Sequence, residues 1–236
     1  MKNKYVSLIA GFTLMVMLFA ACKKDYYQDT GLAKGKFNGT VLEYLQSKPQ
    51  YFSKLLEVIT LTKMENVFKN ETITFFAPSN PCFDSTISVV NQTLFLTGKD
   101  TITKLSQVPV PVWREMLSRY IFKGKYMLND IPQIDPLQYK TYPGVFMRSY
   151  DSIPMNLGVV YNDEGGAQYA GYRQLRISYT PDISQPPMYW FSAPVASSNI
   201  EPTNGAVHVL VFSQHYFGFS PFEFYSRCLQ YGLDLH

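Results

Sequence analysis

The sequence has little of what several protein classes require. It contains only three cysteines and three histidines, which excludes a disulfide-stapled small protein and argues against a zinc site. Charged residues make up 17% of the chain and the formal net charge is +3, too little for a nucleic-acid-binding surface. With 15 prolines and 14 glycines, the chain is neither collagen-like nor of low complexity.

What the chain does contain is enough apolar material for a sizeable core. Hydrophobic residues make up 46% of its 236 residues, and aromatic residues 16%, with 18 tyrosines and 17 phenylalanines. This composition excludes disorder throughout the chain. The length suits one large domain better than two small ones.

The first residues have the layout of an export signal. Lys2 and Lys4 precede an uncharged, mostly apolar run over residues 6–21, which ends in small residues. A basic start, a short apolar stretch and small residues at its end are typical of a secretory signal peptide. The run is short for a transmembrane helix, although a retained N-terminal anchor stays open as an alternative.

The end of this run, Leu18-Phe19-Ala20-Ala21-Cys22, resembles a bacterial lipobox, with Phe19 where Leu, Val or Ile is usual. The resemblance implies that residues 1–21 are a lipoprotein signal peptide and that Cys22 becomes the acylated mature N-terminus. Several acyl chains on one residue would anchor the protein stably. Residues 22–39 show no clear periodicity and are interpreted as a tether. The layout is similar to that of surface lipoproteins of the Bacteroidetes, so we expect a lipid anchor in the outer membrane, at the cell surface.

Hydrophobic periodicity changes along the mature chain from a helical period to a period of two. It predicts helices that begin at Thr40, Pro49, Met64, Pro81 and Pro109, the fourth ending near Val90. Thr40 and Glu43 have the spacing of a capping box, and Asn80 is expected to cap the fourth helix. Strands are predicted over 72–76, 144–149, 157–161, 172–179, 188–193 and 206–212. Helices early and strands late indicate an α+β fold, as a single domain over residues 40–212.

Three segments together resemble the fasciclin (FAS1) domain. Residues 40–45 resemble its opening helices, residues 73–83 its first box, and residues 200–210, with Asn-Gly-Ala-Val-His at 204–208, its second box. The resemblance implies a β-sheet wedge with helices packed along it, and a binding or interaction domain that is not an enzyme. Residues 213–236 follow this region and are rich in aromatics, so we expect them to pack on the domain or on a partner.

One departure from the family limits what the resemblance implies. Ile121 stands where many members have a histidine after the tyrosine at the position of Tyr120, so integrin-type adhesion is not expected here. Lipidated fasciclin-like proteins of the Bacteroidetes often accompany SusC/SusD-type nutrient importers. The resemblance therefore implies an accessory of a SusCD-like uptake system. Its expected partners are a protein in the outer membrane and the membrane itself, to which the lipid anchor attaches it.

Few residues suggest catalysis, a metal or a cofactor. We expect His208 to be a core histidine on the last strand, and Asn204-Gly205 to form a tight turn with left-handed backbone. A hydrolase acting on glycan or peptide, the enzymatic alternative, would need Asp163, Glu164, Asp182 and His208 to converge. Neither a metal site nor a cofactor site is predicted, and no nucleic acid is expected as a partner.

Aromatic side chains supply the candidate binding residues. Tyr169, Tyr172, Tyr189 and Trp190 lie in or beside the segments that the fasciclin resemblance does not explain. Tyrosine and tryptophan offer apolar area with a polar tip and can stack on sugar rings, so a carbohydrate-binding surface lipoprotein is a further alternative, with glycan or peptide as ligand. Cys82 and Cys228 could form a disulfide in an oxidising compartment; their spacing leaves this open.

Overall fold

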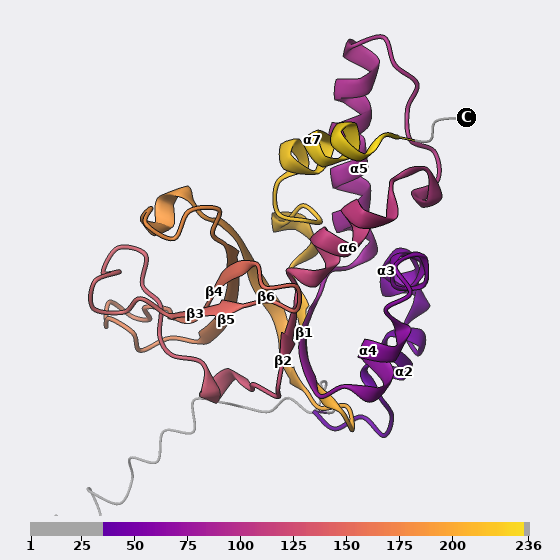
Figure 1. Cartoon of the computed structure of the whole chain (residues 1–236). Coiled ribbons are helices and arrows are strands. Elements are labelled where there is room, and N and C mark those ends of the chain that lie inside the picture. Colours follow the sequence, from indigo (N-terminus) through magenta and orange to yellow (C-terminus); the bar gives the residue numbers. More distant parts are fainter. Residues whose placement is uncertain (1–34, 234–236) are drawn as a thin grey trace, which may run out of the picture. The chain divides into compact units, whose positions relative to one another are not determined.

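The computed structural model describes residues 35–233 (Figure 1), which form one seven-stranded sheet with helices packed against it. The α-helices are α2 (Val41–Gln46), α3 (Pro49–Leu61), α4 (Glu65–Asn70), α5 (Asn80–Leu96), α6 (Val110–Ser118) and α7 (Pro221–Tyr231). The strands are β1 (Ile73–Ala77), β2 (Ile121–Lys123), β3 (Val145–Arg148), β4 (Pro154–Tyr161), β5 (Arg173–Tyr179), β6 (Phe191–Ile200) and β7 (Gly205–Leu210). The predicted α+β sheet wedge is confirmed. Among the described residues, no helix is both long and apolar enough to cross a bilayer.

The sheet has the strand order β2-β1-β7-β6-β5-β4-β3. Strands β1 and β7 pair in parallel, with Phe76 opposite His208, and every other pair is antiparallel. Strand β6 belongs to both halves of the sheet: its first residues pair with β5 and its last with β7. Register shifts between Val195 and Ile200 interrupt the second pairing; such bulges bend a strand, which lets one strand serve both halves.

The early helices form where local signals place them. Thr40 and Glu43 form the predicted capping box, in which the Thr40 hydroxyl accepts from the Glu43 amide and the Glu43 carboxylate accepts from the Thr40 amide. Helix α5 differs from the prediction at both ends. Ser79 rather than Asn80 is its N-cap residue, because the Asn80 side chain instead accepts from the Lys54 amide of α3. The helix continues to Leu96, and Leu94 is buried.

The strand predicted over residues 188–193 is displaced. A 3-10 turn covers Pro187–Tyr189 and β6 runs instead over Phe191–Ile200. Pro187 suits the first position of a helical turn, where no amide hydrogen is needed, so the turn takes up residues 187–189 and pairing with β5 begins at Phe191. Strand β2 was not predicted, because three residues are too few for a periodic signal.

The chain enters the described part beside the turn between β6 and β7. Lys36 pairs with Glu201 in a parallel bridge, and the Phe37 amide donates to the Glu201 carbonyl over 2.9 Å. The ring of Phe37 meets Tyr44 of α2 edge to face. Residues 35–39, the last part of the predicted tether, are therefore held against this end of the sheet.

Residues 217–228 complete the core. Phe217 stacks on Phe83 of α5, and Phe224 of α7 meets Trp113 of α6 edge to face. Both phenylalanines are fully buried. In Figure 1, α5, α6 and α7 gather beyond one end of β1 and β7. Cys82 and Cys228 are buried there as free thiols, and burial raises the pKa of both.

Candidate functional site

His208 of the second box is a core side chain, as predicted. It is fully buried on β7, its Nε2–H donates to the Tyr126 carbonyl over 2.9 Å, and its Nδ1 accepts from the Asn199 amide over 3.2 Å. These partners assign the tautomer. Burial lowers the pKa of His208 to about 4. With both ring nitrogens occupied, the imidazole has no free position for a substrate.

The Asn204-Gly205 pair does not form the predicted left-handed turn, because neither residue has a positive φ. The Asn204 side chain instead donates to the carbonyls of Phe68 and Glu71 and accepts from the Val41 amide, which ties two helices to the sheet. Gly205 lies where a Cβ would be 1.9 Å from the Ile73 carbonyl oxygen. Glycine is therefore needed for close approach of β7 to β1, and not for its conformational freedom.

The residues of the enzymatic alternative lie apart. Asp163 and Glu164 are in the turn from β4 to β5, and Asp182 is in the turn from β5 to β6. Successive turns of an antiparallel sheet lie at opposite ends, here separated by the seven residues of β5, or about 20 Å. Asp182 accepts from the amide and hydroxyl of Ser184. Together with the buried His208, these positions leave no acid–base pair in a common cleft.

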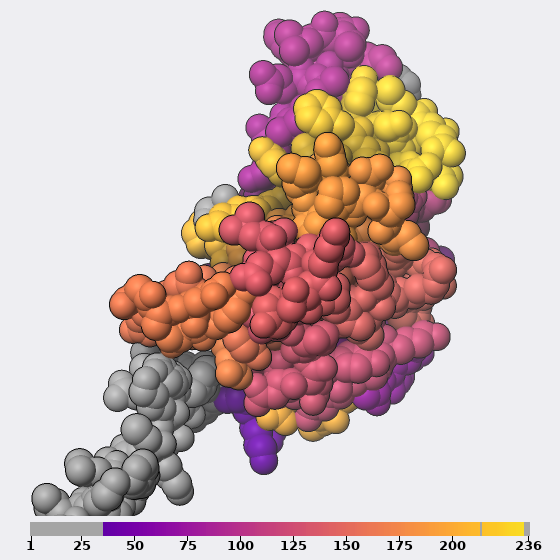
Figure 2. All heavy atoms as spheres, turned by 90° about the vertical axis from the view of Figure 1, so that its left-hand side faces the viewer, coloured from indigo at the N-terminus to yellow at the C-terminus, as the bar shows by residue number. Residues whose placement is uncertain are grey.

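Tyr169 and Tyr172 lie in the projecting hairpin between β4 and β5, the deep-orange lobe of Figure 2. The Tyr169 hydroxyl donates to Asp135 over 2.7 Å, and its amide donates to Asp163. Burial and the hydrogen bond to Asp135 raise the pKa of Tyr169 to about 12. Tyr172 is 68% exposed. Tyr169 therefore holds the hairpin in place, and Tyr172 is the one open to solvent.

Tyr189 and Trp190 lie at the opposite end of β5. Tyr189 is 61% exposed, whereas Trp190 is 8% exposed and donates its indole N–H to the Gln185 carbonyl. The Trp190 ring meets Tyr139 and Phe146 edge to face, each at 5.4 Å between centroids. Trp190 is thus the anchor of the 181–190 loop and presents no face for stacking.

A segment that the sequence did not single out joins the two aromatic groups. Residues 131–144 lie along β4, with the Ile134 amide donating to the Val159 carbonyl, and Ile134 occupies the space that Gly158 leaves for lack of a Cβ. From this segment Asp135 contacts Tyr169 and Tyr139 contacts Trp190. No hydrophobic periodicity distinguishes residues 131–144 in the sequence. The available signal was Gly158, because a glycine inside a predicted strand often marks a place where another segment approaches closely.

Comparison with known proteins identifies the fold. The model of the fasciclin domain family matches residues 50–211, more than half of the chain. The chain belongs to the fasciclin family. Fasciclin domains are in general non-catalytic adhesion and interaction domains. The FAS1 domain pair of the insect cell adhesion molecule fasciclin I is a similar solved structure, at 17% identity and a TM-score of 0.46 over 73% of this chain. This fasciclin chain spans about half (49%) of the length of that chain. No curated protein matches it.

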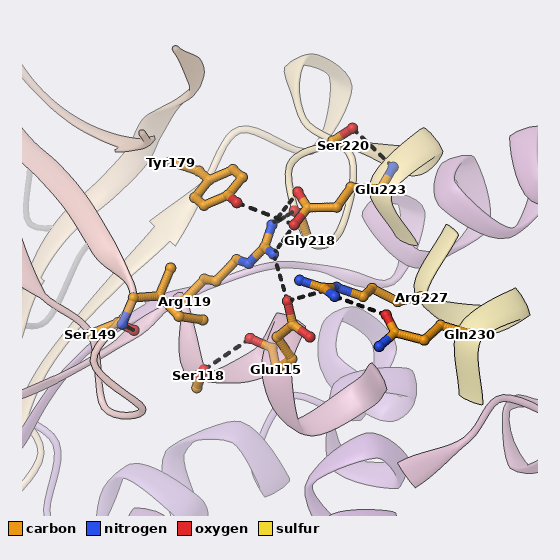
Figure 3. A network of polar contacts seen from close by, with 11 residues as sticks. Glu115, Ser118, Arg119, Ser149, Tyr179, Gly218, Ser220, Glu223, Arg227 and Gln230 are labelled. Carbon is orange, nitrogen blue, oxygen red and sulfur yellow. Dashed lines mark hydrogen bonds and ion pairs between the residues drawn. The ribbon is translucent and has the colours of Figure 1, made fainter. Parts of the chain in front are cut away.

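Beyond the matched fasciclin region, a buried ion-pair network attaches α7 (Figure 3). Arg119, at the end of α6, is 1% exposed and donates to both carboxylate oxygens of Glu223, to the Gly218 carbonyl and to Glu115. Its guanidinium lies 3.9 Å from the ring centre of Tyr179, whose hydroxyl also donates to Glu223. Burial alone would lower the pKa of Arg119, but Glu223 raises it. The guanidinium therefore stays charged and ties together α6, β5 and α7.

His215 holds the start of the same C-terminal segment. The Tyr120 hydroxyl donates to His215 Nε2 and accepts from the Gly218 amide, both over 2.7 Å. Burial lowers the pKa of His215 to about 3. No group of three or more His, Cys, Asp or Glu side chains that could hold a metal occurs between residues 35 and 233.

The two buried histidines predict a loss of stability in mild acid. A histidine in the unfolded chain has a pKa near 6.5, whereas His208 and His215 stay neutral in the folded fasciclin domain down to about 4 and about 3. The unfolded state therefore binds more protons below pH 6.5, and the free energy of unfolding falls as pH drops from 6.5 toward 4. Urea unfolding from pH 7.5 to 4.5 measures this slope, which is expected to be shallower in His208→Gln and His215→Gln. An NMR titration with either histidine near pKa 6.5 would contradict it.

Proposed function

We propose that this fasciclin protein is a non-catalytic, lipid-anchored interaction protein of the outer membrane, tethered through Cys22 and exposed at the cell surface, where it serves as an accessory of a SusCD-like nutrient uptake system. The interaction role rests on the large apolar side chains that are exposed around Trp190. An enzymatic role has less support, because the acidic residues proposed for it lie at opposite ends of β5. Exposed apolar patches of this kind mark interaction sites. The lipobox resemblance supports the anchor.

The place where the chain enters the domain fits a tethered protein. Residues 35–39 are held against the β6–β7 turn, so the 13 residues from Cys22 to Gly35 could span at most about 45 Å. The 181–190 loop precedes the other end of β6, ten residues and at most about 33 Å away along the strand. A partner could therefore reach this loop while the N-terminal side of the domain stays near the membrane.

Labelling with palmitate tests the anchor. Cells that express the parent chain are expected to incorporate label into it, and a Cys22→Ser version is expected to remain unlabelled and to leave the membrane fraction. Equal labelling of the two would end the proposal of an anchor at Cys22. Protease treatment of intact cells then distinguishes surface exposure, with cleavage expected, from a periplasmic location.

Affinity purification from native membranes tests the accessory role. The acylated protein is expected to recover a SusCD-like importer in stoichiometric amount. Recovery of no outer-membrane protein would refute that role. A carbohydrate platform is less well supported, because the exposed Tyr172 and Tyr189 lie at opposite ends of the sheet and Trp190 is buried.

A further inference from the structure

A cleft opens between α3, α5 and residues 102–105, and we call it the α3–α5 cleft. In Figure 1 the chain leaves the far end of α5 and returns toward α3 before α6 begins. Two residues of α3, three of α5 and residues 102–105 line the cleft, and its volume is about 340 Å³. At about 30 Å³ for each water-sized group, it holds about eleven non-hydrogen atoms. The cleft therefore suits a small molecule.

The buried part of the cleft lining is apolar. Phe83 and Ile102 are 1% and 4% exposed, and Ile87 and Leu105 are partly exposed. The Phe83 ring stacks on Phe217 with 4.1 Å between the ring centroids, which fixes its position. Aliphatic and phenyl groups offer a ligand apolar contact but no hydrogen bonds, so this part of the cleft favours an apolar group over a sugar.

Side chains from outside the cleft hold residues 102–105 in place. The Asn91 side chain donates to the Ile102 carbonyl over 2.8 Å and accepts from the Ile102 amide over 2.7 Å. The Gln107 side-chain oxygen accepts from the next two amides, and the Trp113 indole N–H donates to the Leu105 carbonyl over 2.9 Å. The cleft is therefore pre-formed, and little conformational entropy is lost when a ligand binds.

Four charged residues line the cleft, and their charges sum to zero. Lys54 of α3 forms an ion pair with Asp84 of α5. The other two, Glu57 and Lys104, are exposed and form an ion pair with no residue between 35 and 233. One carboxylate and one ammonium group are thus left for a ligand.

The charges and the size decide which ligand fits. An inorganic anion or a fatty acid would find a partner in Lys104 but would place a like charge near Glu57, which disfavours both. A ligand that carries an ammonium group and a carboxylate satisfies both residues. With an apolar side chain and about eleven non-hydrogen atoms in all, such a ligand has about the size of phenylalanine.

We propose that the α3–α5 cleft binds a free amino acid with a large apolar side chain. The carboxylate of the ligand lies on Lys104 and its ammonium group on Glu57. Phe83 and Ile102 take up the side chain. This inference goes beyond the proposed function and does not depend on it, because the cleft contains neither Cys22 nor any residue exposed around Trp190. The outcomes of palmitate labelling and of affinity purification therefore leave it untouched.

Calorimetric titration of the full acylated chain in detergent tests the cleft. L-phenylalanine is expected to bind with a Kd of about 0.1 mM or tighter. L-phenylalaninamide lacks the carboxylate and N-acetyl-L-phenylalanine lacks the ammonium group, so each is expected to bind at least about tenfold more weakly. Glycine has no side chain for the apolar part of the cleft and is expected to give no binding heat at the same concentrations.

A variant of one lysine tests which group reads the carboxylate. Lys104→Gln is expected to weaken L-phenylalanine at least about tenfold but to leave the affinity for L-phenylalaninamide unchanged, because the amide lacks the group that Lys104 contacts. The matched control is Lys99→Gln, which changes an exposed lysine outside the cleft lining and is expected to leave both affinities unchanged. Circular dichroism verifies that each variant is folded.

Three outcomes would overturn the proposal. One is the absence of L-phenylalanine binding to the parent chain up to about 10 mM. Another is a loss in Lys104→Gln that is equal for L-phenylalanine and its amide, or that Lys99→Gln reproduces, since the cleft would then not read the carboxylate. The third is tighter binding of L-phenylalanyl-L-phenylalanine than of L-phenylalanine, which would assign the cleft to peptides and not to free amino acids.

Discussion

An Arg119→Ala variant is expected to lose about 4 kcal/mol of unfolding free energy. Arg119 is buried at the junction of α6, β5 and α7, and its removal leaves Glu223 without its cation and Tyr179 without the guanidinium over its ring. Breaking a buried ion pair from one side typically costs about 3–5 kcal/mol, and the cavity adds to it. Equilibrium unfolding in urea at pH 7 measures the loss.

A second arginine of the same region provides the control. Arg114 forms two hydrogen bonds of 3.0 Å with Asp151, but both side chains are much more exposed than that of Arg119. An exposed pair contributes about 0–1 kcal/mol, so Arg114→Ala is expected to cost less than about 1 kcal/mol. Equal losses in the two variants would show that burial does not govern the Arg119 network. Hydrogen exchange should locate the extra opening of Arg119→Ala in residues 213–231.

A Gly205→Ala variant is expected to lose about 3 kcal/mol or more. The added Cβ would fall 1.9 Å from the Ile73 carbonyl oxygen, and backbone atoms of β1 cannot move aside as the end of a side chain could. Relief requires β7 to separate from β1, its parallel neighbour in the sheet. Overpacking of this kind is among the few causes of large losses.

The control for Gly205 is another glycine without a positive φ. At Gly35 the nearest atom to an added Cβ is the Asn199 carbonyl oxygen at 3.4 Å, an ordinary contact. Gly35→Ala is expected to change the free energy of unfolding by less than about 0.5 kcal/mol. If Gly205→Ala were as mild in thermal and urea unfolding, the close approach of β7 to β1 would not be the reason for glycine there.

The parts of the fold that the sequence predicted depend on local signals. Thr40 and Glu43 are three residues apart, and a capping box needs nothing else. The helix predicted from Pro49 needs only the helical period of its apolar residues, and the three segments that resemble the fasciclin domain together indicated the family. These signals were sufficient for the α+β class, for the early helices and for the burial of His208.

What the sequence could not supply depends on residues far apart in the chain. Arg119 meets Glu223 across 104 positions, and no spacing rule connects them. The roles of Gly205 and Asn204 were misassigned because an Asn-Gly pair is by itself a turn signal. Their actual roles depend on contacts with Ile73 and Phe68, which only the folded structure reveals. Long-range contacts also explain why Trp190 is buried while its chain neighbour Tyr189 is exposed. Tyr139 and Phe146 cover Trp190.

The packing of residues 217–228 has a consequence for the order of events during synthesis. Phe83, Trp113 and Tyr120 are made early, yet the side chains that cover them, Phe217 and Phe224, leave the ribosome almost last. The faces of α5 and α6 that these side chains cover therefore stay uncovered until synthesis is nearly complete, since non-local contacts must wait for both partners. A nascent chain that leaves these apolar faces open for so long needs protection from aggregation until residues 217–228 have emerged.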